Sequence, residues 1–253
     1  MRGAYGQAYD KSWLIGTDAI LKLTFTSSIP DTITFLDSVG VNWSSAASNI
    51  SDTSGNILFY CNGTEVGNIR AQIMDNGDTL TDLLFYNDYQ AGFIEPQTNI
   101  ILPKADNTFY LFYYSESDSL YATGTIDEPD RLYYAVVDMN QNGGLGKVIS
   151  KKNIAYKGLF GDCRLTACRH GNGRDWWLVH QGFQSNQYFV YRVTPDSIYG
   201  PNIQNIGPSV FYNDNNGAQS VFSADGAKFA TIWLLSPQNT YYYQIRFVAL
   251  LHE

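Results

Sequence analysis

A polar turn followed directly by an apolar, aromatic-rich run occurs four times along the chain, and this repeat limits the folds that the chain can adopt. The four copies read SDTSGNILFYC at 51–61, PKADNTFYLFYY at 103–114, RHGNGRDWWLVH at 169–180 and SADGAKFATIWLL at 223–235. Gly, Asn and Asp favour tight turns, whereas aromatic and β-branched residues favour strands. Each copy therefore predicts a hairpin. Almost no segment of the chain has the spacing of an amphipathic helix.

The turns repeat at a regular interval. Their centres lie near residues 55, 107, 173 and 226, which gives a period of about 50 to 65 residues. Further apolar runs, such as 131–139 and 187–194, follow each hairpin, and four strands per repeat is the number in a propeller blade. We therefore predict an all-β chain forming a single β-propeller segment, 1–253, with four-stranded antiparallel blades, about four or five of them in an incomplete ring. The expected units are 12–36 (partial), 45–80, 97–155, 163–207 and 217–250.

Composition narrows the function classes. Only 16 % of residues are charged, while 19 Tyr and 14 Phe are present, a balance typical of exported β proteins. The net charge of −8, with no local Lys/Arg cluster, disfavours nucleic acid as a partner. No segment approaches the roughly 18 apolar residues of a membrane-spanning helix. Cys61, Cys163 and Cys168 lack the paired spacing of a zinc site and are expected to be small buried side chains.

The stretch LTACRHGNGRDWWLVHQG, 165–182, holds the residue types needed for acid-base chemistry. Gly171 to Gly173 accept the positive φ of a tight turn, which predicts a hairpin whose second strand begins at Trp176. Strand alternation then places Trp176 and Trp177 on opposite faces, both apolar. His170 and His180 flank this hairpin and are expected to be hydrogen-bonded structural residues, with a general base as the alternative.

One turn resembles half of a calcium loop. Asp138, Asn140 and Asn142, followed by Gly143, alternate oxygen-bearing side chains before a glycine, but Ile149 stands where a bidentate Glu is needed. A hairpin turn is therefore the favoured interpretation, a weak calcium site is the alternative, and no other cofactor is expected.

Tyrosines on or beside the two longest insertions are the candidates for ligand contact. We name these the first insertion (78–97) and the second insertion (115–130). Loops present side chains to ligands more readily than strands do. The candidate ligand-binding residues are Tyr86, Tyr89, Tyr113, Tyr114 and Tyr121. No catalytic residue is expected, because no pair of carboxylates has a spacing that indicates glycosidase chemistry.

Several segments carry a family resemblance. ISDTSGNILFYCNGTEV, LYYAVVDMNQNGGLGKVISKKNI, LTACRHGNGRDWWLVHQ and VFSADGAKFA resemble, in this order, propeller-like regions of secreted Bacteroidetes surface proteins. Those proteins often carry a type nine secretion sorting domain or a gliding-motility-associated C-terminal domain. The last piece is also similar to TolB-like and WD40-like repeats, with Ala224 where proline is usual. The resemblance spans most of the chain and implies export and a propeller fold, but no catalytic residue.

The sequence therefore predicts a non-catalytic, secreted or cell-surface module for adhesion or for protein or glycan interaction. The alternative is a carbohydrate-active enzyme domain with carboxylates in the propeller channel. Neither an export signal nor a sorting domain is visible in the sequence. Two interpretations of the C-terminal segment therefore stand side by side: a truncated or frame-shifted end, or an ordinary strand of the last blade at 241–248. Unclosed blade edges near 20–36 and 220–250 are expected to favour self-association.

Overall fold

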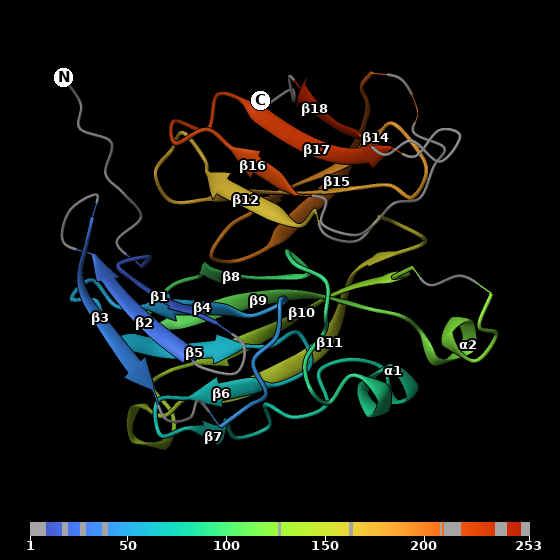
Figure 1. Ribbon diagram of the computed structural model, residues 1–253. Coiled ribbons are helices and arrows are strands. Elements are labelled where there is room, and N and C mark those ends of the chain that lie inside the picture. The colour runs from blue at the N-terminus through green and yellow to red at the C-terminus, as the bar shows by residue number, and fades with distance from the viewer. Residues whose placement is uncertain are drawn as a thin grey trace.

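The computed structural model describes residues 9–16, 20–25, 29–36, 40–125, 128–161, 164–207, 209, 219–235 and 242–248. These residues form five antiparallel sheets, each made of strands that follow one another in the chain (Figure 1). No helix within these ranges is long and apolar enough to cross a membrane.

The sheets are numbered in chain order. The first contains β1 (Ser12–Ile15), β2 (Ile20–Phe25) and β3 (Pro30–Leu36), and the second contains β4 (Ser48–Ser51), β5 (Ile57–Cys61), β6 (Val66–Asn68) and β7 (Gln72–Ile73). The third contains β8 (Asn99–Pro103), β9 (Thr108–Ser115), β10 (Arg131–Asp138) and β11 (Lys147–Lys157). The fourth contains β12 (Thr166–Arg169), β13 (Trp176–Gln181), β14 (Gln187–Val193) and β15 (Ile198–Asn205), and the fifth contains β16 (Ser220–Phe222), β17 (Phe229–Leu235) and β18 (Tyr242–Val248). The short helices are α1 (Leu83–Asp88), α2 (Asp118–Tyr121) and the 3₁₀ turn η1 (Asn142–Gly144).

The all-β prediction is confirmed, and three of the sheets have the four antiparallel strands that were expected. The first, second, fourth and fifth sheets lie within the ranges 12–36, 45–80, 163–207 and 217–250, whereas the third sheet runs from Asn99 to Lys157 and so extends beyond 155. The first and fifth sheets have three strands each in the described part of the chain. Segment 242–248 is an ordinary strand, because Phe229 pairs with Val248 and Leu235 with Tyr242 along the length of β17.

All four predicted turn centres have a left-handed backbone. Their φ angles are 87° at Gly55, 59° at Asn107, 73° at Gly173 and 70° at Gly226. Glycine adopts this region without a steric penalty, and Asn tolerates it better than most residues. At the three glycine turns, the backbone N–H of the glycine donates to the carbonyl three residues earlier, which closes a β-turn.

Strand β9, an inner strand of the third sheet, is buried on both faces. Along β9, Phe109, Leu111 and Tyr113 enter the apolar layer shared with the second sheet. The alternate residues Tyr110, Phe112 and Tyr114 enter the layer shared with the fourth sheet. This period of two follows from the pleat, which sends successive side chains to opposite faces.

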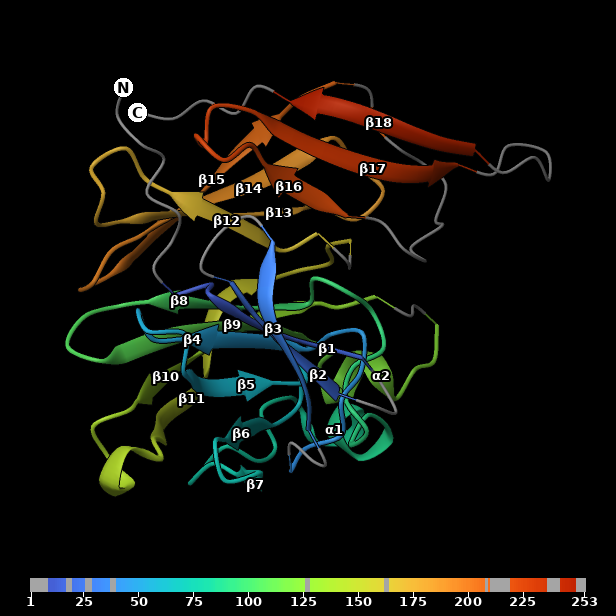
Figure 2. The ribbon, with the colours of Figure 1, turned by 60° about the vertical axis from the view of Figure 1, so that its left-hand side comes forward.

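Successive sheets stack face to face through apolar layers. The described residues form four such clusters, which lie between the first and second, second and third, third and fourth, and fourth and fifth sheets. The first strands of neighbouring sheets contact one another at β1 and β4, β4 and β8, and β12 and β16. Figure 2 shows the fourth and fifth sheets above the second and third, with β3 of the first sheet in front.

Candidate functional site

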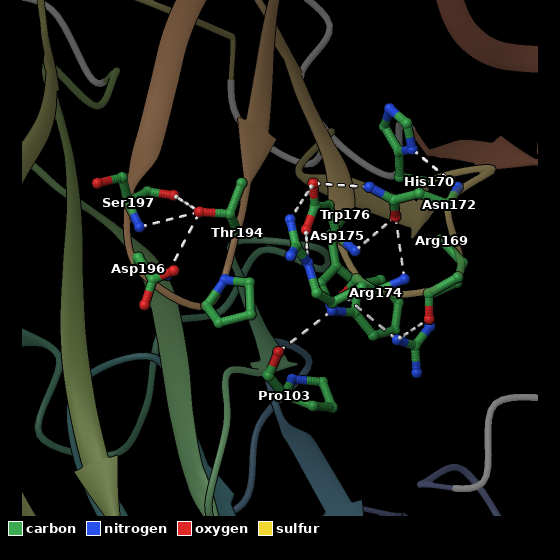
Figure 3. Close-up of polar contacts among 12 residues, drawn as sticks. Pro103, Arg169, His170, Asn172, Arg174, Asp175, Trp176, Thr194, Asp196 and Ser197 are labelled. Atoms are coloured by element: carbon green, nitrogen blue, oxygen red, sulfur yellow. Dashed lines mark hydrogen bonds and ion pairs between the residues drawn. The ribbon is translucent and has the colours of Figure 1, made fainter.

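The hairpin of 165–182 is a structural turn whose polar side chains bond to the backbone of the turn and to one another. The Asn172 side-chain oxygen accepts hydrogen bonds from the backbone N–H groups of Arg174, at 3.0 Å, and of Asp175, at 2.9 Å. Its amide nitrogen donates to the Asp175 carboxylate at 2.8 Å, and Arg174 Nε donates to the same carboxylate at 2.7 Å (Figure 3). The Arg174 hydrogen bond, aided by Asn172, lowers the pKa of the Asp175 carboxyl. Asp175 is therefore an ionised turn residue whose carboxylate already accepts hydrogen bonds from Asn172 and Arg174.

The two tryptophans that follow this turn diverge as the alternation predicts. Trp176 is 2 % exposed and lies between the third and fourth sheets, where its Nε1 donates to the Pro103 carbonyl at 3.2 Å (Figure 3). The Arg169 guanidinium covers this indole at 4.4 Å from the ring centroid. Trp177 is half-buried and packs on the opposite layer, towards the fifth sheet.

The two histidines of the hairpin have different structural roles. His170 Nδ1 accepts a hydrogen bond from the Asn172 backbone N–H at 3.0 Å, and its ring lies against Trp177. His180 is fully buried, stacks on Phe189 with ring centroids 4.7 Å apart, and has Nε2 3.2 Å from the Tyr191 hydroxyl. Burial lowers the pKa of His180 to about 3, so this imidazole is neutral at physiological pH. The geometry agrees with the structural role expected from the sequence.

A cavity of about 660 Å³ lies between the turns that follow β12 and β16. Its ionisable groups are held in their own turns: Asp225 accepts hydrogen bonds from the Ser223 hydroxyl, at 2.6 Å, and from the Ala227 N–H, at 3.0 Å. Burial raises the pKa of the Cys168 thiol to about 12, so it lacks the thiolate character of a nucleophile. The same effect raises the pKa of Cys61 to about 12. Cys163 lies outside the described residues.

Both insertions lie at the same end of the third sheet. β8 begins where β9 ends, because Asn99 pairs with Tyr113. β10 also begins there, because Arg131 pairs with Ser115. The first insertion precedes β8 and contains α1, and the second insertion joins β9 to β10 and contains α2. Figures 1 and 2 accordingly show α1 and α2 together beside one end of this sheet.

The start of α1 is fixed to the third sheet by Asp82. The Asp82 carboxylate accepts hydrogen bonds from the Tyr133 hydroxyl at 2.8 Å and from the Ser115 hydroxyl at 3.1 Å. The backbone N–H of Asp82 donates to the same Ser115 oxygen at 3.0 Å. Because Tyr133 and Ser115 belong to β10 and β9, this network sets the position of the helix on the sheet.

The two helices are also joined to each other by side-chain hydrogen bonds. The backbone N–H of Leu84 donates to the Asp118 carboxylate at 2.8 Å. The Tyr121 hydroxyl donates to the Asp88 carboxylate at 2.5 Å. One helix therefore orders the other, although each is too short to be stable alone.

A small cavity lies between these insertions, and we call it the insertion pocket. Its volume is about 40 Å³. Three aromatic rings form part of its wall: the Phe85 centroid lies 4.5 Å from that of Tyr89 and 5.0 Å from that of Phe93. Phe85 and Tyr89 are four residues apart, which puts them on one face of α1 and its end. The full lining comprises Phe85, Tyr89, Phe93, Ile94, Glu95, Glu116, Glu128 and Pro129.

Three carboxylates line the insertion pocket from separate parts of the chain. Glu95 precedes β8 and is half-buried, Glu116 follows β9, and Glu128 precedes β10. Glu116 and Glu128 are only 3 % and 2 % exposed. The buried Arg164 lies at the same end of the third sheet, beside Gly161, but does not line the cavity. Their positions share no motif spacing, so only the strand register brings these carboxylates together.

The predicted tyrosines fall into three groups. Tyr89 lines the insertion pocket, and Tyr121 lies beside it with its ring centroid 5.9 Å from that of Phe85. Tyr86 points elsewhere and donates to the Glu65 carboxylate at 2.6 Å. Tyr113 and Tyr114 lie within β9 and are buried, so they fill the apolar layers and are not presented by a loop. Sequence reasoning missed Phe85 and Phe93, for which the aromatic density of the first insertion was the available signal.

The turn resembling a calcium loop uses its oxygens internally. The Asp138 carboxylate accepts hydrogen bonds from Asn140, through its backbone and side-chain nitrogens, and from the Gln141 side chain, all at 2.9 Å. The Asn142 side-chain nitrogen donates to the Gly146 carbonyl at 3.0 Å. No group of three or more metal-binding side chains occurs among residues that the structure describes. The arrangement is that of a hairpin turn between β10 and β11.

No protein-family model matches the chain, and no curated protein sequence matches it, so these comparisons assign it to no family. The geometry of the insertion pocket is therefore the basis for assigning a function.

Proposed function

We propose that the chain is a non-catalytic binding module of the β-propeller type, exported to the cell surface or beyond, which holds a protein or glycan ligand at the insertion pocket. Five consecutive antiparallel sheets in the described residues support the propeller arrangement, because each sheet packs on the one before it. Hydrogen bonds near the first strands add to this support: the Leu165 N–H donates to the Gln97 carbonyl, and the Gln97 side chain bonds to the backbone of Ser220. Gln97 thus links the third, fourth and fifth sheets.

The observation that carries the binding proposal is the insertion pocket itself. Two insertions, held together by the Asp118 and Asp88 carboxylates, enclose a cavity with an aromatic wall and acidic groups. Apolar concave surfaces with a few polar groups are the usual form of a ligand site. Loops on a rigid scaffold are also where binding residues concentrate.

The carbohydrate-active alternative gains one observation, because Glu116 and Glu128 are buried carboxylates at one cavity. Glycoside hydrolysis would require this cavity to admit a sugar ring between an acid and a base or nucleophile. A volume of about 40 Å³ has room for only about three water-sized groups. Binding of a narrow group therefore fits the pocket better than hydrolysis of a glycoside.

The test is a screen of the full chain on peptide and glycan arrays, with Tyr89→Leu and Phe35→Leu as paired variants. Tyr89 lines the pocket, whereas Phe35 is 75 % exposed on β3, so both changes remove one aromatic ring. A ligand retained by Phe35→Leu and lost by Tyr89→Leu supports the proposal. If every ligand found is indifferent to Tyr89→Leu, the insertion pocket is not the binding site.

A further inference from the structure

We propose that a second cavity, between the first and second sheets, binds an aliphatic monocarboxylate such as a medium-chain fatty acid. This inference goes beyond the proposed function, because the cavity is separate from the insertion pocket. Three properties lead to it: the size and apolar wall of the cavity, the lysine that enters it, and the engagement of its other polar side chains.

The cavity is largely apolar and has the size of a ligand site, and we call it the Lys22 pocket. Its volume is about 280 Å³, against about 40 Å³ for the insertion pocket. Small-molecule sites typically measure about 300–1,000 Å³, so this cavity lies close to that range. Methylene groups gain free energy when they leave water for an apolar wall. The lining includes Leu14, Lys22, Leu36, Asn56, Ile57 and Tyr60.

Lys22 enters this space from β2, the middle strand of the first sheet. Successive residues of a strand alternate between its faces, so Ile20, Lys22 and Thr24 share one face of β2. Ile20 is buried in the apolar cluster that contains Tyr60 of the second sheet. The Thr24 methyl group lies beside Gly55 in the turn between β4 and β5. This face is therefore the inner one, and Lys22 carries its charge towards the second sheet.

The ammonium group of Lys22 is available to an anion. Lys22 is half-buried, and none of the ion pairs among the described residues involves it. Within the part of the chain that the structure describes, the lining contains no other charged side chain. A partly desolvated charge gains when an opposite charge comes within hydrogen-bonding distance. A carboxylate carried by the ligand supplies that opposite charge.

The other polar side chains of the Lys22 pocket are already engaged, which selects an apolar ligand body. The Tyr60 hydroxyl donates to the Asn68 carbonyl at 2.6 Å. The Asn56 side-chain nitrogen donates to the Asp52 carboxylate at 2.9 Å. A peptide would bring amide N–H and C=O groups that need partners in such a site, whereas an alkyl chain brings none. The net charge of −8 also disfavours polyanions such as nucleotides, so a single carboxylate on an alkyl chain fits best.

The experiment titrates the full chain with butanoate, hexanoate and octanoate, followed by calorimetry and by NMR of the backbone amides. Octanamide is the neutral probe of the same length, and octylammonium carries the opposite charge. We expect one octanoate per chain, with an affinity that rises about three- to fourfold for each added methylene. Octanamide should bind at least about tenfold more weakly than octanoate, and octylammonium more weakly still. The amide shifts should concentrate on β2 and the start of β5.

Matched variants locate the site. Lys22→Met keeps a long side chain without its charge, so octanoate should bind about tenfold more weakly while octanamide is unaffected. Lys22→Arg keeps the charge and should retain the preference for octanoate. Leu36→Ser removes part of the apolar wall and should weaken both probes by about fivefold. Lys157→Met is the charge control, because Lys157 is exposed on β11 and does not line the pocket, and it should leave the affinity unchanged. Circular dichroism should show all four variants folded.

The outcomes test this inference separately from the proposed function. Equal binding of octanamide and octanoate, or no binding of octanoate to the folded wild-type chain, would overturn the carboxylate assignment. Full octanoate affinity in Lys22→Met, or an equal loss in Lys157→Met, would place the contact outside the Lys22 pocket and overturn it as well. Tyr89→Leu, at the insertion pocket, should leave octanoate binding unchanged, so the failure of one site does not decide the other.

Discussion

Trp176 and Trp177 are neighbours in the chain, yet their side chains enter different apolar layers. The sequence predicted this separation because the Gly171–Gly173 turn fixes where β13 begins, and strand alternation does the rest. It could not predict that Trp176 would be the more buried, because that depends on the Pro103 carbonyl and the Arg169 guanidinium. Those partners come from another sheet and from across the hairpin.

The two tryptophans give a matched stability test. Trp176→Ala should lower the free energy of unfolding by about 3–5 kcal/mol, because it opens a cavity in a buried layer. Trp177→Ala should cost less, because Trp177 is half-buried. Urea unfolding of both variants measures the difference. Equal losses, or a loss below about 1 kcal/mol for Trp176→Ala, would show that the hairpin does not pack as described.

His180 makes stability depend on pH in a defined window. Its folded pKa of about 3 lies below its ordinary value of 6.5, so the unfolded chain binds the proton more tightly between these values. Stability is therefore complete above about pH 6.5 and is lost as pH falls towards 3, by about 2 kcal/mol at pH 5. Carboxyls with a lowered pKa, such as Asp175, also lose their stabilising contribution on acidification, but only as the pH falls below about their ordinary pKa of 3.8.

The measurement for His180 is urea unfolding at pH 7, 6 and 5. His180→Phe keeps an aromatic ring beside Phe189 and should remove most of the loss of stability over this range. His170→Asn is the matched control and should retain that loss. A wild-type chain that is equally stable at pH 5 and pH 7 would contradict a neutral, buried His180.

At the level of secondary-structure elements, local sequence patterns predicted the turns and strands but not the helices. All four turn centres and the strands beside them follow from Gly, Asn and Asp punctuation between aromatic runs. Helices α1 and α2 do not follow, because six and four residues carry too little periodicity to be recognised. They exist through contacts with β9, β10 and each other. The insertion pocket was unpredictable for the same reason.

Asp118 tests whether the two insertion helices support one another. Asp118→Ala removes the acceptor of the Leu84 N–H and should cost about 1 kcal/mol locally. We expect faster amide hydrogen exchange across α1 with little change in the protection of β9. Tyr121→Phe should have a similar effect through the loss of its hydrogen bond to Asp88. Unchanged exchange in both variants would mean that α1 is ordered by the third sheet alone.

The β10–β11 turn carries the calcium prediction. Because Asp138 already accepts three hydrogen bonds from its own turn, calcium must displace those donors to bind. A millimolar site at millimolar calcium stabilises the fold by well under about 1 kcal/mol, so the melting temperature should change little on addition of calcium. Differential scanning calorimetry with calcium and then a chelator measures this. A large reversible shift that Asp138→Ala abolishes would establish a calcium site.

For the whole molecule, the repeat period predicted the order of the sheets, and the incomplete ring expected from the number of repeats stays a prediction. Within the described residues, four apolar clusters join five sheets in sequence, and none joins the fifth sheet to the first. The strands of 12–36 form their own sheet and do not pair with β18 in the described ranges. Closure depends on contacts between opposite ends of the chain, which a local repeat pattern does not encode.

The outer strands of the first and fifth sheets lead to the last prediction, which concerns self-association. β3 exposes Ile33 and Phe35, at 59 % and 75 %, and β18 exposes Ile245 and Phe247, at 60 % and 81 %. Edge strands with unpaired backbone groups and exposed apolar side chains favour pairing with another chain. Light scattering after size exclusion should therefore show oligomers that increase with protein concentration.

Charges placed on these edges should oppose that association. Phe35→Lys and Phe247→Lys, combined, should shift the chain towards monomer without loss of fold, because both side chains are largely exposed. Ile69→Lys is the matched control, since Ile69 is 58 % exposed but lies outside the strands. If the wild-type chain is monomeric at every concentration, or if Ile69→Lys dissociates it equally well, the exposed edges are not the contact. Dissociation by the edge variants alone would instead identify β3 and β18 as the surfaces through which the sheet stack extends.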